Sequence, residues 1–159
     1  MRFLAILLGA FLVAGCSTSG GNPTAQNDGL VRDTTPGGVR FMAPTEVVAE
    51  PGWPDAMREI DVAVAGFESA FSGRRLAIDH IHFHGMDESS DDDRACFVGD
   101  GKIEACYHET EAHLFCLSGA LRDLAADQYP DAPVWQLDWA EQVSTSWVAN
   151  LYGIGARLD

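Results

Sequence analysis

A change in the spacing of apolar residues at Gly73 is the sequence feature that most constrains the fold. Before it, apolar side chains recur at steps of three and four residues: Met57, Ile60, Val64, Phe67 and Phe71. This spacing predicts an amphipathic helix over residues 55–72, with Asp55 as its N-cap. After Gly73, residues 76–84 predict a β-strand in which Leu76, Ile78 and the histidines lie on one face and Ile81 and Phe83 on the other. Both faces carry apolar residues, so the sequence leaves open which face is buried.

The rest of the chain adds a hairpin and two more helices. Residues 95–107 predict a hairpin around Gly99-Asp100-Gly101, because Asp-Gly tolerates the positive φ angles of tight turns. Leucines at helical spacing predict a helix over residues 110–128, and Asp131 and Pro133 open a third helix that ends near Tyr152. Gly153 is the expected C-terminal cap of this helix.

The third helix carries large apolar side chains at steps of four: Trp135, Trp139, Val143, Trp147 and Leu151. A stripe of this kind predicts burial against the other helices. Together the elements predict an α+β fold. We expect a small single domain over residues 39–159, with a three-stranded sheet (one strand plus the hairpin) packed against about three helices.

The N-terminus predicts export and a lipid anchor. Arg2 precedes an apolar run that is too short to span a membrane but typical of a signal peptide. The run ends in Leu12-Val13-Ala14-Gly15-Cys16, which resembles the lipobox of bacterial lipoproteins. The resemblance implies removal of residues 1–15, a diacylglyceryl group on the Cys16 thiol and further acylation, for example with palmitate, of the new N-terminus.

Residues 16–38 then predict a flexible tether between the lipid and the domain, because they are small, polar and broken by Gly and Pro. Ser17 after the cysteine resembles the outer-membrane class of lipoproteins. The resemblance therefore implies a cell-envelope protein that is attached through Cys16 to the outer membrane and faces the periplasm.

The charge of the chain restricts its partners. It has 24 Asp or Glu residues against 10 Lys or Arg, a formal net charge of −14. This excess argues against nucleic acid as a partner, because its phosphates would be repelled. An envelope protein is the partner class that fits the predicted location.

The segment DHIHFHGMDE places three histidines at every second position: His80, His82 and His84. Alternation puts their imidazoles on one side of the strand, about 6.6 to 7 Å apart. Two could reach one zinc or copper ion if another ligand came from elsewhere, such as His108 or a nearby carboxylate. The pattern resembles the His-Phe-His strand of α-class carbonic anhydrases over six residues only. A partly exposed strand without metal is the alternative.

The order helix, strand, hairpin, helix resembles the core of zincin-like metallopeptidases. In that register residues 103–107 form the edge strand. Arg122, Asp123 and Ala126 then stand where the His, Glu and second His of HExxH belong. Arg and Ala cannot ligate zinc, and Asp is shorter than the Glu that polarises the water. The resemblance thus implies a degenerate scaffold that lacks HExxH, and we identify no catalytic residues.

Three further cysteines remain: Cys96, Cys106 and Cys116. An exported protein can form disulfides, so one bridge and one free thiol are expected. Cys96 could pair with Cys106 across the hairpin. Cys106 could instead pair with Cys116 and join a strand to a helix, which is the arrangement we favour.

These observations leave three hypotheses for the function. The first is a lipid-anchored envelope protein whose domain is a non-catalytic binding or scaffold domain. The second is a periplasmic lipoprotein that binds zinc or copper through the HIHFH strand. The third is a zincin-like hydrolase with a site that no motif identifies. Whether the chain is an enzyme stays open, and the incomplete catalytic set favours a non-enzyme.

Overall fold

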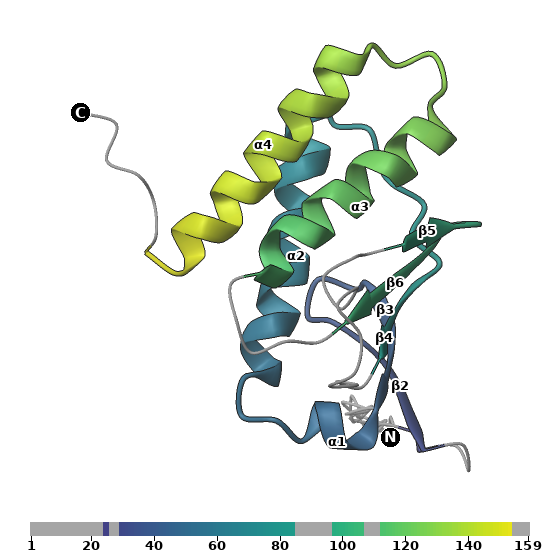
Figure 1. Ribbon diagram of the computed structural model, residues 1–159, viewed down its shortest axis with the longest axis vertical. Helices are drawn as coiled ribbons and strands as arrows, with labels where there is room; N and C mark the ends of the chain where they lie inside the picture. The colour runs from purple at the N-terminus through teal and green to yellow at the C-terminus, as the bar shows by residue number, and fades with distance from the viewer. Residues whose placement is uncertain (1–23, 26–28, 85–96, 107–111, 154–159) are drawn as a thin grey trace, which may run out of the picture.

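The computed structural model (Figure 1) describes residues 24–25, 29–84, 97–106 and 112–153, and it confirms the α+β class. The elements in chain order are β1 (Thr24–Ala25), β2 (Leu30–Thr34), β3 (Arg40–Pro44), α1 (Thr45–Val48), α2 (Trp53–Ala70), β4 (His80–His84), β5 (Phe97–Gly99), β6 (Lys102–Cys106), α3 (Ala112–Gln128) and α4 (Val134–Leu151).

The described strands form one mixed sheet in the order β1-β2-β3-β4-β6-β5. Strand β4 is parallel to both of its neighbours, β3 and β6, and the other pairs are antiparallel. The expected strand and hairpin are both present, and Asp100 and Gly101 have the positive φ angles (50° and 76°) of a tight turn. The expected number of three strands is too small, however, because the chain before the predicted strand adds β2 and β3 to the sheet.

Strand β2 lies within the segment that the sequence assigned to a tether. Its Val31 is buried in the core. At the following turn, the Thr35 hydroxyl donates to Asp61 of α2, and the Gly37 amide donates to the same carboxylate at 2.7 Å. The folded domain therefore begins by Leu30 and not at Val39, because pairing with β3 and contacts with α2 hold this segment in place.

The helices α2, α3 and α4 lie together on one side of the sheet (Figure 1). The sheet turns its apolar side chains toward them: Val31, Phe41, Ala43, Ile81, Phe83 and Ile103. Helix α4 packs mainly on α2 and α3. It forms an outer layer of the molecule, which leaves much of its circumference in contact with solvent.

Helix α2 begins two residues before the expected N-cap Asp55. Its first residue is Trp53, and Pro54 occupies the first turn, where its missing N–H costs no hydrogen bond. The Trp53 ring packs edge-on against Phe41 and Phe83, with centroids 5.3 and 5.0 Å away. The helix starts early because this indole joins it to the sheet. Gly73, with a φ of 70°, follows its end as expected.

The expected burial of the tryptophan stripe on α4 is wrong. Trp135, Trp139 and Trp147 are 69%, 54% and 43% exposed, and the buried face is a row of smaller residues: Leu137, Ala140, Ser144 and Val148. The small residues let α2 approach closely. A Cβ added to Gly66 of α2 would lie 3.1 Å from the Trp147 ring and 3.3 Å from the Ser144 Cα, and the Ser144 hydroxyl donates to the Ala63 carbonyl at 2.9 Å.

Within the described residues, no helix has the length and apolar character needed to cross a membrane. The apolar run at residues 3–14 and Cys16 lie outside the described residues.

Candidate metal-binding site

The three histidines of β4 lie on the face of the sheet that the helices do not cover. Ile81 and Phe83 point into the core, and His80, His82 and His84 alternate with them. The sequence left this orientation open, because both faces of the strand carry apolar residues. The helices decide it, since Ile81 and Phe83 fill the core between the sheet and α2.

The parallel pairing of β4 with β6 brings a carboxylate to two of these histidines. His82 lies opposite Glu104 in the register of the two strands. The Glu104 Oε2 atom is 3.0 Å from His82 Nδ1 and 2.5 Å from His84 Nε2. The two imidazole rings lie 4.4 Å apart between centroids. One oxygen therefore sits between two ring nitrogens.

His82, His84 and Glu104 together form a group that could hold a metal ion. Each offers one ligand atom, and these atoms all lie within 4.8 Å of one another. Ligand atoms of a tetrahedral zinc ion, bound at about 2.0 to 2.1 Å, are about 3.3 Å apart. Small side-chain rotations on two paired strands would bring the three atoms to that spacing.

Electrostatics favour the ligating form of His82. Burial is the main cause that lowers the pKa of His82, and the neighbouring imidazoles of His84 and His80 lower it too, against the opposing effect of Glu104. A lowered pKa keeps the imidazole neutral near pH 7. Only the neutral ring has a lone pair for a metal ion.

His80, the other expected ligand among the described residues, does not belong to this group. His80 lies on the same face, but its Nδ1 is 3.0 Å from Asp79 Oδ2. This hydrogen bond, together with the charge of Arg40, lowers the pKa of the Asp79 carboxyl. His108 and the acidic residues from Asp87 to Asp93 lie outside the described residues.

Glu104 is the residue that the sequence analysis missed. The sequence did carry a signal for it, because Ile103 and Glu104 are neighbours on a predicted strand and so point to opposite faces of the sheet. With Ile103 buried in the core, Glu104 lies on the face that the helices do not cover. What the sequence did not show is that β6 pairs with β4 in parallel. A shift by one residue would have turned Glu104 away from the histidines.

A hollow of about 380 Å³ lies beside His80, although His82, His84 and Glu104 do not line it. Arg32, Met42 and His80 are among its lining residues, and Met42 is the register partner of His82 on β3. Arg40, also in the lining, pairs with Asp79 at 2.8 Å. The surroundings of the histidines are therefore polar, with one thioether close by.

The residues in the metallopeptidase register form no site. Arg122 Nη2 lies 2.8 Å from Asp138 and its Nε lies 3.4 Å from Glu141, both on α4. Ala126 packs against the core. Strand β6 is not the edge strand that this register requires, because β5 lies outside it and β4 is parallel to it.

The cysteines are described only in part. Cys116, in α3, is disulfide-bonded. Cys96 and the side chain of Cys106 lie outside the described part of the chain. The pairing of Cys106 with Cys116 therefore stays a prediction.

No protein-family model, no curated protein and no solved structure matches this chain.

Proposed function

We propose that the folded domain binds a transition-metal ion, zinc or copper, through His82, His84 and Glu104. The observation that carries the proposal is the convergence of three ligand atoms from two paired strands within 4.8 Å. Two imidazoles and a carboxylate are a ligand set that suits these ions. Because β4 and β6 lie next to each other in the sheet, the backbone positions the ligands before the ion arrives.

The position of the group suits reversible binding. The His84 side chain is 49% exposed and that of Glu104 is 38% exposed, so an ion could exchange with solvent. Three protein ligands also leave one position of a four-coordinate ion for water or another molecule. We infer a role in buffering or passing on metal in the exported compartment.

Met42 offers a way to tell zinc from copper. Its thioether is a soft ligand that suits Cu(I) and contributes little to zinc. Met42 is half-buried beside His82 on the open face of the sheet. If copper is the ion, Met42→Leu, which preserves the side-chain volume, should weaken Cu(I) binding and leave zinc binding unchanged.

The test is metal content on the chain from Ser17 onward, which includes every described element and omits Cys16. After dialysis against zinc or copper we expect about one equivalent of metal per chain. Glu104→Gln should weaken binding by at least about 10-fold, and His82→Ala/His84→Ala should abolish it. His80→Ala is the matched control, because His80 is on the same strand but outside the group, and it should bind metal as the wild type does.

Two results would contradict the proposal. The first is a folded wild-type chain that takes up neither ion at micromolar concentration, in which case the three residues form only a hydrogen-bonded cluster. The second is equal loss of metal in His80→Ala and Glu104→Gln, which would place the ion elsewhere on the strand.

A second candidate function is the binding or scaffold role that the sequence suggested. It is favoured by one observation, the gathering of exposed tryptophans on α4. The two functions are compatible, because the metal-binding group and α4 lie on different layers of the domain.

A further inference from the structure

Helix α4 carries an apolar surface that the rest of the described chain covers only in part, since Trp147 packs against Gly66 of α2 on one side. The large hydrophobic residues that are exposed among the described residues all lie on this helix or at its end: Val134, Trp135, Trp139, Trp147 and Tyr152. Trp135 and Trp139 are one helical turn apart, so they are neighbours on the surface of the helix. We call Trp135, Trp139 and Trp147 the tryptophan face. Exposed apolar groups gathered on one element usually mark an interaction site.

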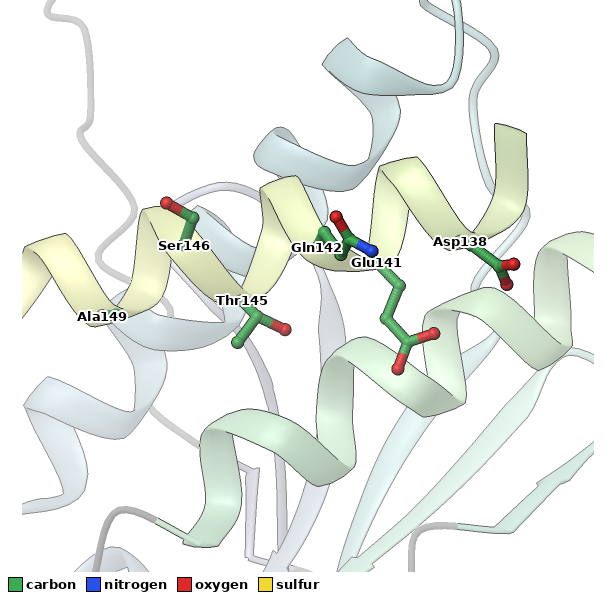
Figure 2. Close-up of a pocket in the computed structure, with 6 residues that line it drawn as sticks. All are labelled: Asp138, Glu141, Gln142, Thr145, Ser146 and Ala149. Carbon is green, nitrogen blue, oxygen red and sulfur yellow. The ribbon is translucent and has the colours of Figure 1, made fainter. Parts of the chain in front are cut away.

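A groove runs along α4 next to this face. It has a volume of about 480 Å³ and is lined by Asp138, Glu141, Gln142, Thr145, Ser146 and Ala149. Figure 2 shows these side chains along α4, with α3 beside them. Trp135 and Asp138, and likewise Trp139 and Gln142, are three residues apart in the helix and so are surface neighbours. A ridge of indoles and a groove therefore lie in parallel on one helix.

The groove carries less negative charge than its two carboxylates alone would give it, although the chain as a whole has a formal net charge of −14. Helix α4 has two acidic residues, Asp138 and Glu141, and both contact Arg122 of α3, at 2.8 and 3.4 Å. The single positive charge of Arg122 offsets one of these two negative charges, which reduces the repulsion of a second acidic molecule. The methyl groups of Thr145 and Ala149 add apolar lining, and the carboxylates can accept hydrogen bonds from indole N–H groups.

We propose that α4 is the interface of a homodimer in which two copies pack antiparallel about a twofold axis. The tryptophan face of each copy inserts into the groove of the other, as ridges insert into grooves where helices pack. A surface that contains both a ridge and the matching groove is self-complementary, which is what a twofold interface requires. This inference does not depend on metal binding.

The area of the surface suits a reversible dimer. With the exposed fractions of the three tryptophans, the indoles offer about 400 Å² of apolar surface per copy. Two copies with their flanking residues would bury about 1,000 to 1,200 Å² in total, near the lower limit of specific interfaces. We therefore expect a dissociation constant in the micromolar range.

The test is sedimentation velocity on the chain from Ser17 onward, at about 1 to about 200 µM and in the presence of a chelator. We expect a monomer–dimer equilibrium that tightens between about 0.05 and about 0.5 M NaCl, because salt screens the repulsion of two acidic chains. Trp139→Ser should weaken it by at least about 10-fold, and Thr145→Arg, which places a charge in the groove, should do the same. Arg58→Ser, on the exposed side of α2, is the control.

Mixing the two variants gives a sharper result. A Trp139→Ser chain retains its groove and a Thr145→Arg chain retains its tryptophan face, so one of the two ridge-in-groove contacts can form between them. The mixture should therefore associate more tightly than either variant alone. Circular dichroism of each variant would confirm that its helices are intact.

Three outcomes would overturn the proposal. One is a wild type that stays monomeric at the highest concentration and salt. Another is a dimer that neither substitution weakens, since it would use a different surface. The third is a monomer whose tryptophan fluorescence shifts to the blue on zwitterionic phosphatidylcholine vesicles, with the shift lost in Trp139→Ser. That result would assign the tryptophan face to a membrane surface.

Discussion

Glu59, on α2, is a carboxyl group whose ionisation changes on folding. Burial is the main cause that raises its pKa, to about 7, and the charge of Asp55 adds to it. The Tyr152 hydroxyl donates to the same carboxyl group. In the unfolded chain the pKa returns to about 4.5. Between these two values the folded state binds more protons than the unfolded state, so this group makes stability fall as pH rises from about 4.5 to about 7.

We expect Glu59→Gln to remove this fall. The carboxyl is partly exposed, so we discount the effect for solvent screening to about 1 kcal/mol in the free energy of unfolding. The measurement is urea unfolding at about pH 5 and about pH 7.5, compared between the wild type and the variant. Glu46→Gln, which removes an exposed charge on α1, is the control. The same pH dependence in the wild type and Glu59→Gln would contradict the assignment.

Part of the candidate metal-binding site could be predicted from the sequence. Strand alternation placed His82 and His84 on one face, as the structure has them. It also placed His80 there, but alternation says nothing of neighbours on other strands, and Asp79 engages that ring. Glu104 could not be found by distance along the chain, because 20 residues separate it from His84.

At the scale of elements, the helices and the hairpin could be predicted because their signals are local. Strand β2 could not, since residues 24–38 are rich in Gly, Pro and polar residues. The sequence allowed an extended segment after Val39, but it did not place β3 in the sheet. Residues 30–34 form a strand because they pair with β3 and because Thr35 and Gly37, at the next turn, bind Asp61. The prediction that the tryptophans of α4 are buried was also wrong. Apolar periodicity identifies an apolar stripe on a helix, but it does not show whether the helix lies inside the molecule or in its outer layer.

Removal of β2 tests where the domain begins. A chain that starts at Val39 loses buried Val31 and the two hydrogen bonds to Asp61, which together should cost about 3 kcal/mol in the free energy of unfolding. It also exposes β3 as an unpaired edge, so we expect aggregation at high concentration. A chain that starts at Gly29 should match the chain that starts at Ser17. Urea unfolding and light scattering measure both effects, and equal stability of all three chains would refute this domain boundary.

At the scale of the whole molecule, the layers separate the two candidate surfaces. The open face of the sheet carries the metal-binding group, and α4 on the far side of α2 and α3 carries the tryptophan face. If the predicted lipid anchor holds the domain on a membrane, the domain could therefore present both surfaces without one blocking the other.

The lipid anchor is a prediction about the whole molecule that rests on the N-terminal sequence. Two or three acyl chains should hold the protein on a membrane durably, because each buried methylene contributes about 0.8 kcal/mol. In a bacterial host we expect the wild type in the membrane fraction after carbonate washing, and Cys16→Ser in the wash or retained with its leader. Intact-mass analysis should show added acyl mass on the wild type only. A wild type that washes off without acyl mass would exclude the anchor.

The sequence by itself determined the elements whose patterns lie within one stretch of chain: α2, α3, α4, the histidine strand and the tight turn at Asp100-Gly101. Periods of 3.6 and 2 residues follow from the geometry of a single helix or strand, so they need no partner. The tertiary structure alone decided the rest. The histidines face outward because Ile81 and Phe83 complete the core, Glu104 joins them through the register of β6, and the tryptophans face solvent because α4 is an outer layer. Each of these depends on segments that are distant along the chain, and only their packing sets which side chains meet.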